Sequence, residues 1–344
     1  MGKRILHLDI LRVLACLMVV MMHSPMPGEN AKGWLSVPLS YLTMPCIGIF
    51  FAVSGALLLP VTTPPSSSYV WLKRRLSKVI APTIFWTFVF ILIDGTIWDE
   101  GWKSAGIRLC SIPFSVQGHG VMWFMYTLIS LYVIAPIISP WIEKASEKSL
   151  RFYLILWGVS LCYPWLELIG LKINHDTTSP LYYISGYAGY FVLGYYLRHY
   201  AERIKIWCIA PAYILSWILL AAYKLSNSNS EGNIYDLFWY LSIFSPIMVI
   251  FWWKITKNLK LSDALMPKLA KLSNLTFGVY LSHIFIMRYG IWKIEFIATM
   301  QNYVLQTLIV ICLTVIGSFL VSYIISLLPV GDYLIGYRKK ASSN

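Results

Sequence analysis

The chain has 344 residues, of which 58% are hydrophobic and only 12% are charged, and its formal net charge is +13. A soluble globular domain carries about twice that charged fraction, so the composition excludes an ordinary soluble enzyme. The apolar residues recur in runs of about 20, the length that a helix needs to cross a bilayer. We therefore predict an all-helical polytopic membrane protein. We attribute the positive charge to loops that orient the helices rather than to nucleic-acid binding.

Ten candidate membrane spans follow one another, and the loops between them are too short for a separate soluble module. They cover residues 8–26, 38–60, 79–97, 121–140, 151–170, 181–197, 206–223, 236–253, 275–292 and 303–328. Of the lysines and arginines in the loops, 20 lie on the side of both termini and 7 on the other side. Positive loops stay in the cytoplasm, so both termini are predicted to be cytoplasmic. A single integral-membrane domain is expected over residues 1–344.

The first span carries a polar stripe inside an otherwise apolar helix. Asp9, Arg12, Cys16 and His23 share nearly one face, because eleven residues at about 100° each return to within about 20° of the start. Arg12 and His23 then lie about 16 Å apart along the helix axis. Charged groups in hydrocarbon are costly, which makes such residues candidates for function. A structural alternative stays open: Arg12 can reach the interface or pair with Asp9, and a neighbouring helix can satisfy His23.

A basic cluster with the sequence WLKRRLSK occupies residues 71–78, just before the third span. Arginine and lysine side chains pair well with phosphate, so Arg74, Arg75 and Lys78 are candidates for binding a phosphate-bearing donor. The alternative is an ordinary cytoplasmic cluster that fixes the orientation of the helices.

Three further segments carry candidate residues for a pore or an acceptor site. Residues 278–283 (GVYLSH) place a second histidine, His283, on the ninth span. Trp123 opens the fourth span, and we interpret His119, just before it, as a loop residue. Residues 182–196 are rich in tyrosine and include Gly186, Gly189 and Gly194, which would let neighbouring helices approach closely. The structural alternatives are a histidine bonded within the bundle, an interfacial aromatic belt and simple interface filling.

Several catalytic signatures are missing from the sequence: a P-loop, GxSxG, HExxH and the dinucleotide-binding glycine pattern. The six cysteines are scattered without metal-site or disulfide spacing. We therefore expect no metal site and no permanently bound cofactor. Any chemistry is expected to occur within the helical bundle.

Taken in order, these segments resemble the integral-membrane acyltransferase 3 family across essentially the whole chain. The matching blocks are Arg12-x10-His23, residues 49–58, Arg75-x-x-Lys78 with Pro82, Trp123-Phe124 with Pro136, and residues 278–283. The tyrosine-rich segment 182–196 is most similar to the surface-polysaccharide O-acetyltransferase branch. That branch includes the enzyme that acetylates enterobacterial common antigen.

The resemblance implies transfer of an acyl group, usually acetyl, from cytoplasmic acyl-CoA to a hydroxyl of a cell-surface polysaccharide or its lipid-linked precursor. The essential Arg and His of the family's first helix map onto Arg12 and His23. Our hypothesis is that His23 is the general base or the acyl carrier, and that Asp9 and Arg12 keep the inner end of the stripe ordered. The family's Arg-x-x-Arg becomes Arg75-x-x-Lys78 here, which keeps the charge but loses one planar guanidinium. Many members have a histidine where this chain has Val121.

The same resemblance implies that Arg75 and Lys78 bind acyl-CoA, and we expect Arg74 of the same basic cluster to contribute. Residues of a pore or acceptor site would be His283, Trp123, Ser54 and Tyr187. The expected location is the plasma (inner) membrane of a bacterium, with acyl-CoA, the glycan acceptor and membrane lipids as partners, no nucleic acid, and homo-oligomerisation left open. One alternative is a proton-coupled glycan exporter or flippase without CoA chemistry, because buried Asp, Arg and His also suit transport. Another is a structural subunit of a polysaccharide synthesis complex.

Overall fold

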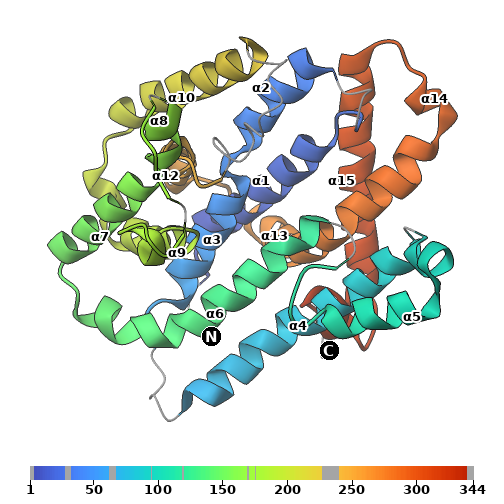
Figure 1. Cartoon of the computed structure of the whole chain (residues 1–344), viewed down its shortest axis with the longest axis horizontal. Coiled ribbons are helices and arrows are strands. Elements are labelled where there is room, and N and C mark those ends of the chain that lie inside the picture. Colours follow the sequence, from blue (N-terminus) through green and yellow to red (C-terminus); the bar gives the residue numbers. More distant parts are fainter. Residues whose placement is uncertain are drawn as a thin grey trace. The chain divides into compact units, whose positions relative to one another are not determined.

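The computed structural model describes residues 4–27, 32–61, 67–93, 95–117, 120–168, 170–174, 176–226 and 240–338. Every regular element within these ranges is a helix (Figure 1). The all-helical architecture predicted from composition is therefore confirmed for the described part of the chain.

Six helical segments of the described residues are long and apolar enough to cross a membrane. They are Leu6–His23, Gly33–Leu58, Ser68–Ile93, Gly120–Lys144, Ile206–Leu225 and Tyr303–Leu327, and each overlaps one predicted span. The other predicted spans contain shorter or more polar helices: α7 (Glu147–Ser160) with α8 (Tyr163–Leu168), α9 (Ala188–Tyr200), α12 (Phe244–Asn258) and α13 (Met266–Ile284). Residues 236–239 of the eighth predicted span lie outside the described residues. The count of ten spans and the cytoplasmic termini stay predictions.

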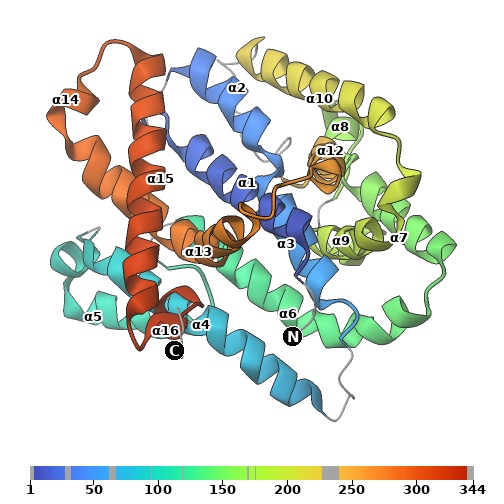
Figure 2. The ribbon, with the colours of Figure 1, turned by 180° about the vertical axis from the view of Figure 1, so that it is seen from behind.

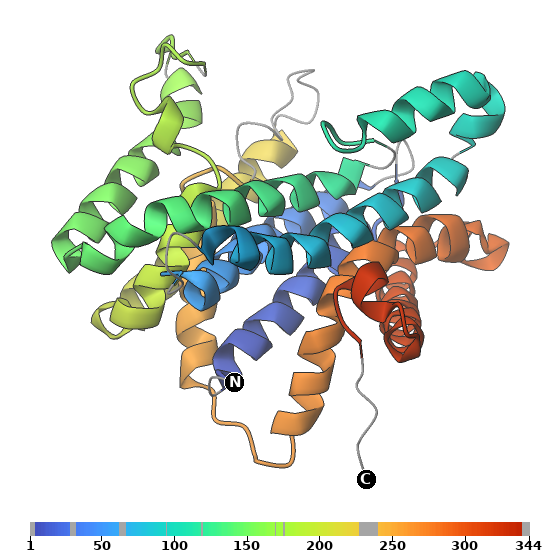
Figure 3. The ribbon, with the colours of Figure 1, turned by 90° about the horizontal axis from the view of Figure 1, so that it is seen from below.

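The chain divides into two compact units. The first unit comprises Met1–Val61 and Ile138–Ala270, and the second comprises Thr62–Ile137 and Lys271–Asn344. Helix α6 (Trp123–Lys144) and helix α13 each belong partly to one unit and partly to the other. Figure 3 shows α12 leading through residues 259–265 into the first turns of α13.

In the first unit, α1 (Leu6–His23) packs against α2 (Gly33–Thr43), α3 (Pro45–Leu58) and α12 (Figure 1). Nine of the 18 residues of α1 are buried, which makes it a central helix of the unit. The second predicted span, 38–60, is made of two consecutive helices, α2 and α3, which meet at Met44. Pro45 begins α3, a position where its missing N–H is no loss.

A very close crossing joins α3 to α9 in the first unit. A Cβ added at Gly55 would overlap the carbonyl oxygen of Phe191, and one added at Gly194 would overlap the carbonyl oxygen of Ala52. Gly189 likewise lies against the ring of Trp157. The prediction of close helix approach is thus confirmed at Gly189 and Gly194.

Gly186 has a different role in the same segment. Its φ of 83° lies in the left-handed region, and nothing lies within 4 Å of its Cβ position. The residue makes the turn before α9, where its carbonyl accepts a hydrogen bond from Trp157 Nε1 at 2.8 Å. Gly186 therefore serves the turn rather than the helix contact that the sequence predicted.

In the second unit, α4 (Ser68–Ile93) packs against α5 (Thr96–Ser111) and the short α16 (Gly331–Ile335). Figure 2 shows α16 beside α15 (Tyr303–Leu327), and Trp86 Nε1 of α4 donates a hydrogen bond to Leu334 O at 3.0 Å. A π-helix, η6 (Phe285–Gly290), continues α13. The remaining elements are η3 (Gly120–Met122), η4 (Tyr182–Ile184), η5 (Ala201–Arg203), α10 (Ile206–Ser226), η7 (Ile291–Lys293) and α14 (Glu295–Ala298).

Candidate functional site

The polar stripe predicted on the first span lies on α1. Asp9 and Cys16 are buried, and Arg12 and His23 are half-buried. Arg12 and His23 each take part in an interaction within the fold. The helix ends at His23, although the span was predicted to continue to residue 26. The imidazole therefore lies on the last turn of α1.

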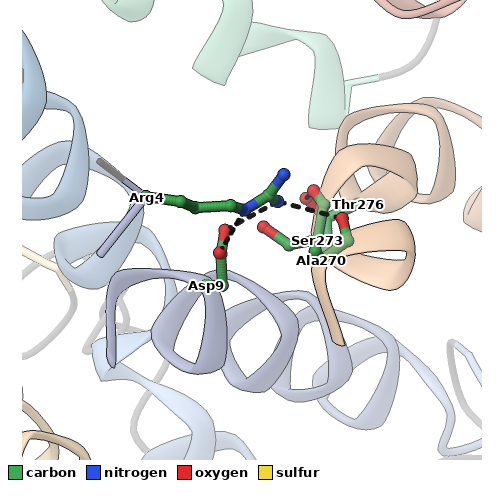
Figure 4. A network of polar contacts seen from close by, with 5 residues as sticks. All are labelled: Arg4, Asp9, Ala270, Ser273 and Thr276. Atoms are coloured by element: carbon green, nitrogen blue, oxygen red, sulfur yellow. Dashed lines mark hydrogen bonds and ion pairs between the residues drawn. The ribbon is translucent and has the colours of Figure 1, made fainter. Parts of the chain in front are cut away.

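Asp9 receives a two-pronged contact from Arg4 (Figure 4). The Arg4 Nε donates to Oδ2, and Nη2 donates to Oδ1 at 3.0 Å and to the carbonyl of Ala270 at 2.9 Å. The Asp9 side chain is 8% exposed and the Arg4 side chain 45%. A bidentate Arg–carboxylate pair is among the stronger and more specific ion pairs. Arg4 thus ties the start of α1 to the first turns of α13.

Replacing Arg4 with glutamine is expected to lower the free energy of unfolding by about 1–2 kcal/mol, because the buried Asp9 carboxylate loses a charged donor. The loss is no larger because the exposed part of the Arg4 side chain is screened by solvent. Thermal unfolding in detergent measures the change. Arg4→Lys, which keeps the charge but not the fork, should lie between wild type and Arg4→Gln. Equal stability of all three proteins would show that the contact stabilises nothing.

Tyr240 adjoins the end of α1 near His23, and Tyr190 in turn contacts Tyr240. Tyr240 is buried, and its hydroxyl donates to Met22 Sδ at 3.2 Å, one residue before His23. The hydroxyl of Tyr190, fully buried on α9, donates to the carbonyl of Tyr240. Tyr240 is not among the residues that the sequence motifs point to. The available signal was a polar ring at the start of a predicted span, which is equally typical of an interfacial belt.

Ser54 and Tyr187 lie in the same unit as the stripe. Ser54 is half-buried on α3, one residue before the crossing glycine Gly55. Tyr187 precedes α9, and its ring centroid lies 5.2 Å from that of Phe51 on α3. The first unit thus brings together the α1 stripe, the 49–58 block on α3 and the tyrosine-rich segment.

Trp123 and His283 belong to neighbouring segments of the second unit. The hydroxyl of Tyr280 donates to the carbonyl of Val121, and the rings of Phe124 and Tyr280 lie 4.8 Å apart. His283 is fully buried on α13, with Nδ1 2.5 Å from the carbonyl of Tyr280. A carbonyl only accepts, so Nδ1 carries the proton in this contact. His119 lies outside the described residues.

The predicted donor-binding residues Arg74, Arg75 and Lys78 are all exposed on α4. The Arg75 guanidinium lies 6.0 Å from the centroid of the Trp71 ring, within the range of a cation–π contact. These three cations are therefore accessible to a ligand. Among the described residues, no group of three or more His, Cys, Asp or Glu side chains is placed to hold a metal ion.

These features define a class of protein: a multi-pass helical membrane protein whose central first helix carries a carboxylate, a guanidinium and an imidazole. Residues 5–323 match the acyltransferase domain that defines the acyltransferase 3 family. The match runs from the residue before α1 into α15. The chain therefore belongs to the acyltransferase 3 family. No curated protein and no solved structure matches it.

Proposed function

We propose that the protein is a membrane-embedded O-acyltransferase of a bacterial plasma membrane. It moves an acyl group, acetyl in the simplest case, from cytoplasmic acyl-CoA to a hydroxyl of a cell-surface polysaccharide or its lipid-linked precursor. The family match over residues 5–323 carries this proposal, since it covers the first helix with Arg12 and His23.

In the proposed reaction, His23 is the general base. An imidazole has an ordinary pKa near 6.5, suited to taking a proton from a hydroxyl. The sugar oxygen attacks the thioester carbonyl, the carbon–sulfur bond breaks, and the CoA thiolate leaves and takes up the proton. In a second form of the reaction, His23 first accepts the acyl group and then passes it to the sugar. Arg12 and Asp9 keep the opposite end of the stripe ordered, a role supported by the Arg4–Asp9 contact.

The exposed cations Arg74, Arg75 and Lys78 bind the phosphates of the donor in this proposal. Ser54, Tyr187, Trp123 and His283 contribute to the acceptor site or to a pore that leads to it. Support for this role comes from the placement of Ser54 and Tyr187 in the unit that holds the stripe, and from the aromatic surroundings of Tyr187.

Replacing Arg75 with alanine is expected to raise the Kd for acetyl-CoA by roughly 10- to 100-fold, because a charge-assisted hydrogen bond to phosphate is lost. The effect should fall on donor affinity, with little change in turnover at saturating donor. Isothermal titration of the purified protein measures it. Lys73→Ala removes an exposed charge from the same helix and is the matched control. Unchanged affinity in Arg75→Ala would break the phosphate assignment.

The overall activity is tested by expressing the protein in a bacterial host and measuring ester-linked acetyl groups on its surface polysaccharides by mass spectrometry. New O-acetylation that requires the protein supports the proposal. Expression of folded protein without any new acyl ester on glycan or lipid-linked sugar would contradict it.

A further inference from the structure

A second group of cations lies in the first unit, where α9, η5, α12 and the start of α1 meet. Lys254 of α12 is buried, at 6% exposure, and its Nζ donates to the carbonyl of Ala201 at 3.0 Å. Lys257, one turn further on, lies 2.6 Å from Glu202 Oε1, and Lys254 lies 3.9 Å from Glu202 Oε2. A lysine that ends inside the protein is unlike the solvated lysines that normally set membrane topology.

The positive charge of this group exceeds its negative charge. Arg198 at the end of α9 donates to the carbonyl of Ala56, a neutral acceptor. Both Arg198 and Lys257 act electrostatically on the ring of His7, which places them around the start of α1. Among the described residues, Glu202 is the carboxylate paired with Lys254 and Lys257, and its side chain is 72% exposed. Lys254 and Lys257 thus share one solvent-facing carboxylate, and the contact of Arg198 is to a neutral carbonyl.

Two buried ring nitrogens lie at the start of α1 and on α12, the helix that carries Lys254 and Lys257. His7 and Trp253 form an edge-to-face pair with ring centroids 5.5 Å apart, and Trp253 directly precedes Lys254. Within the described residues, neither His7 Nε2 nor Trp253 Nε1 has a hydrogen-bond partner, and Trp253 is fully buried. Buried polar groups are nearly always hydrogen-bonded, and an indole N–H can only donate. The cations therefore lack matching negative charge, and the two ring nitrogens lack hydrogen-bond partners.

We propose that this cluster, made of His7, Arg198, Trp253, Lys254 and Lys257, binds a phosphate group. Phosphate supplies both the negative charge and the acceptor oxygens that the cluster lacks, and Arg and Lys are its usual partners. Two sources share this chemistry: the phosphates of the CoA donor, which rests on the proposed function, and the headgroup of an anionic phospholipid. The site is distinct from the exposed Arg74, Arg75 and Lys78 on α4.

The test uses full-length protein in phosphatidylcholine nanodiscs, as wild type, Lys257→Gln and Arg198→Gln. Lys260→Gln is the matched control, since Lys260 is an exposed lysine three residues beyond Lys257. One arm titrates CoA calorimetrically, with phosphate-free pantetheine as a comparison. The other arm adds phosphatidylglycerol to the nanodiscs and measures the rise in melting temperature. Arg198 is exposed, so Arg198→Gln guards against a folding defect in Lys257→Gln.

A loss of about tenfold in CoA affinity in both variants, with pantetheine and Lys260→Gln unaffected, assigns the site to the donor. A lost phosphatidylglycerol effect in both variants, retained in Lys260→Gln, assigns it to a lipid headgroup. If both variants match wild type in both arms, the phosphate site is overturned. If folded wild type binds no CoA, the proposed function is rejected independently of the phosphate site. The phosphatidylglycerol experiment alone then tests whether the cluster binds phosphate.

Discussion

Replacing His23 with alanine is expected to abolish acyl transfer to the glycan. The loss of a positioned general base costs about 10²- to 10⁴-fold in rate, and the loss of an acyl carrier would cost more. The protein should remain folded, because His23 is only half-buried and lies on the last turn of α1, outside the buried core. Mass spectrometry of surface polysaccharide from cells that express the variant measures the remaining O-acetylation.

His199→Ala is the matched control for this experiment. His199 is an exposed histidine in the last turn of α9, outside every site proposed here, so its replacement should leave acetylation near the wild-type level. Fluorescence-detected size exclusion verifies that both variants are folded. Wild-type acetylation in a folded His23→Ala protein would remove His23 from the reaction and, with it, the proposed chemistry of the α1 stripe.

Replacing Gly194 or Gly55 with alanine is expected to cost about 3 kcal/mol or more in stability. At each position a Cβ would overlap a backbone carbonyl of the opposite helix, and a carbonyl cannot move aside as a flexible side chain can. Helices α3 and α9 would have to separate, which disturbs the surroundings of Phe51 and Tyr187. The yield of monodisperse protein and its melting temperature measure the effect.

Gly106→Ala is the control for the glycine variants. Gly106 lies within α5, and nothing lies within 4 Å of its Cβ position. Alanine is also the better helix former, so this variant should melt at or above the wild-type temperature. If Gly194→Ala and Gly55→Ala both have the melting temperature of the wild type, the close crossing of α3 and α9 is incorrect.

Composition and span length predict the helical membrane class, because they reflect the solvent that each residue must face. The sequence also contains the signal that ends α1 at His23, although we predicted the helix to continue to residue 26. Pro25 disfavours helix at the residue before it, and the Ser24 hydroxyl bonds back to the carbonyl of Val20 at 2.6 Å. The long apolar run concealed this stop signal.

Long-range partners could not be predicted in the same way. Arg4 precedes the apolar run and was counted among the charges that set topology. In the fold its partners are Asp9, in the first turn of α1, and the carbonyl of Ala270 on α13. The glycines of α9 predicted close approach but not the partner, which is the α3 backbone at Ala52. Such contacts depend on how helices pack, and helix periodicity within one segment carries no information about that.

Equilibrium binding of radiolabelled acetyl-CoA to the purified protein decides whether the protein uses acyl-CoA. We expect saturable binding by wild type and by His23→Ala, with release of free CoA in the presence of acceptor glycan by wild type alone. Folded wild-type protein that binds no acetyl-CoA would rule out acyl-CoA as its donor. That result would instead favour a transporter in which the Asp, Arg and His side chains of α1 move protons or substrate.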